Sequence, residues 1–147
     1  MKFFENWIIF NNHQIFISAI ILWKIILSII VGTVIGKERK KKKKPGGSRT
    51  FGLVCMGSTL LAILSLKLLE FGYNFDFVRL MSYGMVSIGF LGSGIIIQNK
   101  NKVEGLTTAS TLWTTVPLGF CIGLGFYALA IICMIFIYLT LESKYNK

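Results

Sequence analysis

The sequence predicts an all-α membrane protein with about five transmembrane helices, with its amino terminus outside the cell and its carboxy terminus in the cytoplasm (N-out, C-in). Apolar residues make up 54% of the 147 positions and charged residues only 15%, and the mean hydropathy is +0.68. The apolar residues form blocks long enough to cross a bilayer, which takes ~20 residues per helix. Eight of the sixteen basic residues lie in one segment, 37–49, between two such blocks. This pattern excludes a water-soluble globule.

The first predicted crossing covers residues 15–36 and ends in the basic run KERKKKKK rather than in a small-residue cleavage site. It is also too long for the apolar core of a signal peptide, so we expect it to be retained. Residues 1–14 have too little apolar length to span, which predicts an interfacial amino-terminal segment. Lys24 interrupts the crossing, and it either snorkels to the interface or pairs with Glu70 or Asp76.

The four remaining crossings are predicted over residues 51–69, 80–97, 106–123 and 126–141. The last two share the uncharged stretch 106–141, which as one helix would be about 54 Å long, nearly twice the ~30 Å hydrocarbon core. The stretch must therefore fold back, and a turn is easiest at the cluster of Gly119, Gly123 and Gly125.

The basic residues of the loops predict the orientation. Cytoplasmic loops of membrane proteins carry an excess of Lys and Arg. With segment 37–49 in the cytoplasm, alternation puts the basic residues of 99–104 and of the tail, 142–147, on the same side. The membrane domain is then 15–141, followed by a cytoplasmic tail.

The sequence shows no signature of an enzyme or of a resident cofactor. Nucleophile triads, phosphate-binding loops and metal-ligand spacings are missing, and the three cysteines lie in apolar runs without a CxxC pair. All six acidic residues fall in loops or at helix ends, which argues against a cation pump because such pathways usually use carboxylates at membrane depth. A site in which backbone carbonyls and water hold Mg²⁺ remains an alternative, because the sequence gives no signal for such ligands.

Small residues recur at helical spacing, which lets helix backbones approach closely in a membrane. These predicted packing positions are Ser28, Gly32 and Gly36, then Gly89 and Ser93, and then Gly119 and Gly123. For Gly89, Gly92 and Gly94 the alternative is a re-entrant or unwound segment.

The fourth helix opens with GLTTASTLWTT, which carries six hydroxyl side chains. They either donate back to helix carbonyls and to neighbouring helices or line a polar path for a ligand or ion. The run Lys40–Lys44 is predicted to fix the topology and to contact anionic lipid headgroups, and no nucleic acid partner is expected.

Four motifs stand in register between residues 30 and 113, within a resemblance that covers about residues 24–138. They read IVGTVIGKERK, PGGSRTFGLVCMGS, SIGFLGSGIII and VEGLTTASTLW. Their order and spacing resemble the MgtC/SapB family of bacterial inner-membrane proteins. The resemblance points to functional residues at Glu38, Arg39, Arg49, Thr50, Arg79, Gly89, Gly92, Gly94, Gly105, Thr107, Thr108 and Trp113. We expect most of the polar ones to gather at the cytoplasmic helix ends, with Glu38 paired to Arg49.

This resemblance implies a location in the bacterial cytoplasmic membrane and a role in magnesium homeostasis and stress survival. It also implies an action on other membrane proteins, because some family members modulate membrane machines that include ATP synthase. We expect a short form that lacks the soluble carboxy-terminal domain of many members. Since membrane-embedded carboxylates are lacking, we favour a non-enzymatic regulator that binds another integral membrane protein. The alternatives are a transporter or channel for Mg²⁺ or another small solute, and a homo-oligomeric scaffold.

Overall fold

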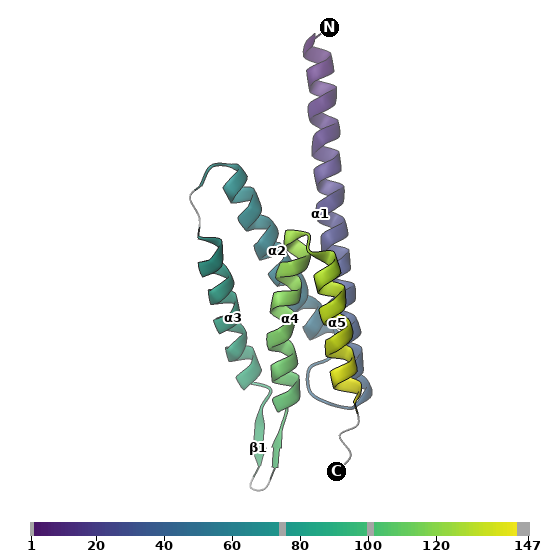
Figure 1. The fold of residues 1–147 in the computed structure, drawn as a ribbon, viewed down its shortest axis with the longest axis vertical. Helices are drawn as coiled ribbons and strands as arrows, with labels where there is room; N and C mark the ends of the chain where they lie inside the picture. The colour runs from purple at the N-terminus through teal and green to yellow at the C-terminus, as the bar shows by residue number, and fades with distance from the viewer. Residues whose placement is uncertain (1, 74–75, 100–101, 144–147) are drawn as a thin grey trace.

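The computed structural model describes residues 2–73, 76–99 and 102–143, with side chains from residue 18 onward (Figure 1). Across these residues the five predicted helices are confirmed. In chain order the elements are α1 (Lys2–Lys41), α2 (Ser48–Glu70), α3 (Phe77–Ser93), β1 (Ile97–Asn99), β2 (Lys102–Glu104), α4 (Leu106–Leu124) and α5 (Tyr127–Glu142). Most of the predicted tail lies outside the described residues.

Two segments are long and apolar enough to cross a membrane, Ser18–Lys41 and Ser48–Glu70. The shorter helices α3 and α5 are also apolar. The central helix, α4, belongs to neither group because hydroxyl side chains fill its first half. The helices are consistent with a membrane protein, and the number of crossings and their orientation stay predictions.

Helix α1 begins at Lys2, well before the predicted start at residue 15. The first fourteen residues contain neither Gly nor Pro, so nothing in the sequence breaks the helix there. The amino-terminal half of α1 extends beyond the rest of the bundle (Figure 1). The interfacial location of residues 1–14 stays a prediction.

Helix α4 lies at the centre of the fold and packs against α2, α3, α5 and α1. In its hydroxyl-rich half the surrounding helices bury Thr108, Thr111 and Thr115, whereas Thr107 and Ser110 are exposed. The approach to α2 is close, because a Cβ atom added to Gly123 would lie 2.5 Å from the Cβ of Ala62. The core around α4 contains Phe51, Cys55, Leu112, Val116, Phe120 and Ile122.

The connection between α3 and α4 differs from the prediction. We expected the third helix to reach residue 97, but α3 ends at Ser93, and β1 and β2 pair as an antiparallel hairpin, with Ile97 opposite Glu104. Three consecutive isoleucines, 95–97, favour extended backbone because of their branched Cβ atoms. Gly105, at φ 87°, then turns the chain into α4.

The connections fall at two ends of the molecule. The loop between α1 and α2, the hairpin and the end of α5 lie at one end (Figure 1). We call this the loop end. The α2–α3 connection and the turn at Gly125 lie at the opposite end. Among the described residues, segment 37–49 and Lys102, which the sequence predicts to share one side of the membrane, therefore share one end of the fold.

Candidate functional site

A buried group of charges joins α1 to α5 at the loop end. Glu38 and Arg39 are each 4% exposed. The Glu38 carboxylate accepts a hydrogen bond from Arg39 Nε and lies 2.9 Å from Lys42 Nζ. Arg39 Nη2 and Lys42 Nζ both donate to the carbonyl of Leu141, the Arg39 bond at 3.3 Å. Since the carboxy-terminal end of a helix carries partial negative charge, the two cations also stabilise the last turn of α5.

The predicted pair between Glu38 and Arg49 is wrong. Arg49 is exposed in the first turn of α2, and Glu38 is paired within its own helix instead. Residues four apart on a helix share one face, which places Lys42 over Glu38 without any contribution from α2. Thr50 is also exposed.

Arg79 lies far from this cluster, at the opposite end of the molecule. It lies in the first turn of α3, where its Nε lies 3.4 Å from the carboxylate of Asp76, and Asp76 also accepts a hydrogen bond from the Arg79 backbone N–H at 3.0 Å. Asp76 is thus the amino-terminal cap of α3. The structure does not bring all of the polar motif residues together.

The motif residues of α3 and α4 divide into buried and exposed groups. Gly92 is buried, and a Cβ there would lie 3.5 Å from the Cβ of Ala109 on α4. Thr108 is 1% exposed, with its methyl group close to Gly46 of the α1–α2 loop. Gly105 is half-buried at the start of α4. The exposed motif residues are Gly89, Gly94, Thr107 and Trp113.

Four of the six hydroxyls at the start of α4 donate to carbonyls of their own helix. Thr111 donates to Thr107 at 2.7 Å, and Thr114 and Thr115 both donate to Thr111 at 2.8 Å. Ser110 donates to the carbonyl of Leu106 at 3.0 Å. For these four hydroxyls the structure has the back-bonding alternative of the sequence analysis.

The small residues singled out in the sequence occupy several environments. Gly32 and Gly36 lie against the first turns of α2, and Gly119 and Gly123 lie against its middle. Ser28 is buried and donates to the carbonyl of Ile25 at 2.7 Å, whereas Ser93 is exposed. A contact that the sequence did not indicate is the bond from Thr59 Oγ1 to the carbonyl of Gly119, at 2.9 Å, which joins α2 to α4.

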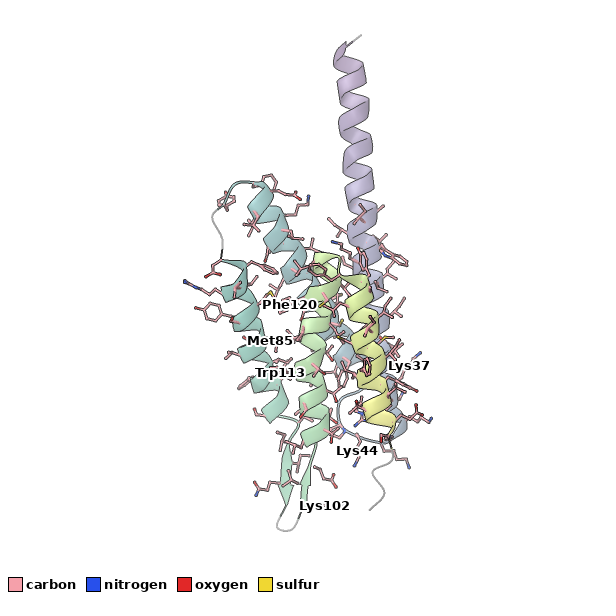
Figure 2. All side chains as sticks on the ribbon, in the orientation of Figure 1. Lys37, Lys44, Met85, Lys102, Trp113 and Phe120 are labelled. Carbon is pink, nitrogen blue, oxygen red and sulfur yellow. The ribbon has the colours of Figure 1, made fainter. Side chains whose placement is uncertain are left out.

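An apolar groove runs between α2 and α3, with α4 as its floor. It has a volume of about 360 Å³. Leu53 and Leu61 of α2 and Tyr83 of α3 line it, with Phe120 of α4 beneath them. Figure 2 shows Phe120 on α4 and the lysines Lys44 and Lys102 near the loop end. The groove was not predicted, because it depends on how far apart two helices lie.

Within the described part of the chain, no group of three or more His, Cys, Asp or Glu side chains is placed to hold a metal ion.

The fold and these contacts define the class, which is a small all-α protein of apolar helices, consistent with a membrane protein, with charged residues gathered near the helix ends. Residues 25–146 match the sequence model of the MgtC family, and the chain belongs to this family. No catalytic activity appears in the names of the relatives below.

Several relatives share a third or more of their aligned residues with the chain. Protein SrpB of Synechococcus elongatus is 37% identical over 82% of this chain and 72% of its own length. Protein SapB of Bacillus subtilis is 34% identical over 86% of this chain and 57% of its own length. The "Putative magnesium transporter YhiD" of Escherichia coli is 34% identical over 85% of this chain and 60% of its own length. The chain thus spans less than two thirds of SapB and YhiD. No solved structure matches the chain.

Proposed function

We propose that this protein is a non-enzymatic regulator in the bacterial cytoplasmic membrane that acts by binding another integral membrane protein. Its family supports a link to magnesium homeostasis and stress survival. The proposed orientation is N-out and C-in, with the loop end in the cytoplasm. The observation that carries the proposal is the open groove between α2 and α3.

The groove has the properties of a docking site for a membrane helix. Its lining is mainly apolar, with the small residues Gly57 and Gly84 on facing helices. A Cβ atom added to Gly57 would meet no described atom within 4 Å. Small residues let the backbone of a second helix approach closely, and this close packing drives helix association in lipid.

The burial of the α4 hydroxyls favours a regulator over a transporter. A path for a hydrated cation needs polar groups that face it and can replace water. Thr108, Thr111 and Thr115 are instead at most 4% exposed, packed against the neighbouring helices. A transporter or channel for Mg²⁺ is the second candidate function, and the name of the relative YhiD is the observation that favours it.

Replacement of Gly57 by Leu tests the proposal, because the new side chain would fill the groove without a clash in the fold. We expect crosslinking in native membranes, followed by purification, to recover one defined membrane protein with the wild-type chain. Gly57→Leu should lower its yield about tenfold, as expected from the loss of roughly 1.4 kcal/mol of binding free energy.

Ala128→Leu is the control, since Ala128 is exposed on α5, away from the groove. Full partner yield with Gly57→Leu would contradict the proposal. Recovery of only copies of this chain, lost in Gly57→Leu, would instead establish the homo-oligomeric scaffold.

A further inference from the structure

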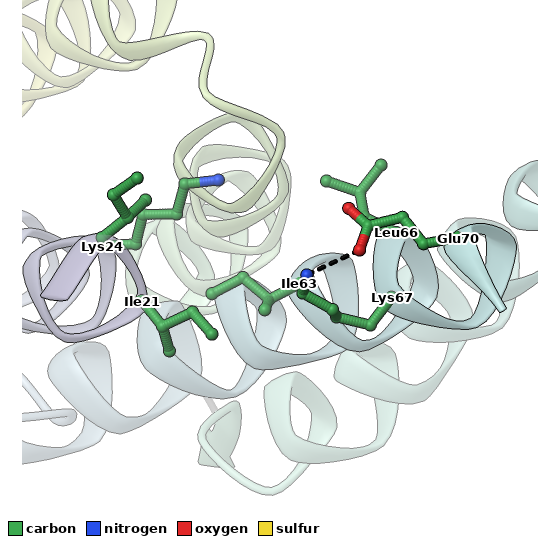
Figure 3. Close-up of a pocket in the computed structure, with 7 residues that line it drawn as sticks. Ile21, Lys24, Ile63, Leu66, Lys67 and Glu70 are labelled. Atoms are coloured by element: carbon green, nitrogen blue, oxygen red, sulfur yellow. Dashed lines mark hydrogen bonds and ion pairs between the residues drawn. The ribbon is translucent and has the colours of Figure 1, made fainter. Parts of the chain in front are cut away.

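A second cavity lies between α1 and α2, at the end of the molecule opposite the loop end (Figure 3). Its volume is about 200 Å³. Lys24 of α1 and Lys67 and Glu70 of α2 contribute its charged groups, and Ile21 and Ile63 are among its apolar walls. None of its lining residues belongs to the α2–α3 groove.

The two lysines have hydrogen-bonding capacity beyond their described contacts. Lys24 Nζ donates to the carbonyl of Gly123 at 2.7 Å, in the last turn of α4. Lys67 Nζ donates to the Glu70 carboxylate at 2.6 Å. An ammonium group has three N–H donors, so each lysine has donors left for a ligand. Two positive charges and one negative charge give the cavity a net charge of one positive unit.

The depth of the cavity matches a membrane surface. At ~1.5 Å per residue, Lys24 lies about 26 Å along α1 from Lys41, and Lys67 lies about 28 Å along α2 from Ser48. The hydrocarbon core of a bilayer is about 30 Å thick. If the basic segment 37–49 lies at one surface of the bilayer, the ammonium groups of Lys24 and Lys67 reach the opposite surface, where lipid phosphates lie.

We propose that this cavity binds the phosphodiester headgroup of a phospholipid. Lys24 and Lys67 donate to the phosphate oxygens, and the isoleucine walls contact the beginning of the acyl chains. A phosphodiester carries one negative charge, which balances the net charge of the cavity. Charge-assisted hydrogen bonds to a phosphate are among the stronger polar contacts, and they offset the cost of holding Lys24 between apolar helices.

The test is a titration of the detergent-purified chain with dioleoylphosphatidylglycerol, followed by native mass spectrometry. We expect Lys24→Gln and Lys67→Gln each to weaken lipid binding about tenfold, as for the loss of one charge-assisted hydrogen bond. Dioleoylglycerol, which has the same acyl chains without the phosphate, should also bind about tenfold more weakly.

Lys102→Gln is the matched control, because Lys102 also pairs with a glutamate, Glu104, but lies at the loop end. Lys24→Gln removes a bond to α4 and can impair folding, whereas the exposed pair of Lys67 contributes little to stability. Wild-type affinity in Lys67→Gln, or equal binding of dioleoylglycerol, would overturn the proposal. If an equal concentration of glycerol phosphate displaced the lipid, the cavity would be a site for a free phosphate compound and not for a phospholipid.

Discussion

Glu38 and Arg39 carry opposite charges that are both held away from water near the end of α1. Their side chains are 2% and 5% exposed. A buried charge is stable only when it is paired, and removal of one partner leaves the other uncompensated. The pair also positions Arg39 against the Leu141 carbonyl, so the packing of α5 on α1 depends on it.

Glu38→Gln is therefore expected to lower the free energy of unfolding by about 3–5 kcal/mol, the usual cost of breaking a buried ion pair. Denaturant unfolding in detergent measures it. Glu104→Gln is the matched control, because Glu104 is 49% exposed in its pair with Lys102 and such pairs contribute at most about 1 kcal/mol. Equal destabilisation by the two variants would contradict the role assigned to Glu38.

The sequence predicted which single residues matter better than it predicted their contact partners. The motifs singled out Glu38 and Arg39, but their partners depend on which residues share a helix face and on how α5 meets α1. Lys24 was expected to snorkel or to meet a carboxylate, whereas its acceptor is a backbone carbonyl of α4. Any residue type can supply such a carbonyl, so the sequence contains no signal for this contact.

At the scale of elements, hydrophobic blocks and basic loops were sufficient to predict five helices. The bounds of α2, α4 and α5 lie within three residues of the prediction. The hairpin of β1 and β2 was missed because the isoleucines at 95–97 extend an apolar helical run, and apolar content alone does not separate helix from strand. The start of α1 was missed because apolar length was taken as its limit, although the preceding residues can also form helix.

The arrangement of the elements gives a prediction about membrane sidedness. Single cysteines at Lys42 and Lys102, in a background without the native cysteines, should react with a membrane-impermeant maleimide only when the cytoplasmic side is exposed. A cysteine at Tyr73 should react in intact spheroplasts, because it follows α2 at the opposite end. The excess of basic residues at the loop end is the physical reason. Labelling of Lys42→Cys and Lys102→Cys from opposite sides would contradict the arrangement.

At the scale of the whole molecule, the helices enclose α4 and leave an open groove on one side of it. Neither feature could be predicted from the sequence, because both depend on the distances and angles between helices, which packing decides. The four motifs did predict the family, since they stand in register over most of the chain. The proposed regulatory role rests on two features of the structure, the groove and the burial of Thr108, Thr111 and Thr115 on α4.

The measurement that tests this account most directly is Mg²⁺ flux into proteoliposomes that contain only the purified chain. A regulator that acts through a partner should give the same flux as protein-free liposomes, and Arg49→Ala and Thr108→Val should change nothing. Flux well above that of protein-free liposomes, reduced by Thr108→Val at an equal amount of folded protein, would contradict the account and establish the chain as a transporter.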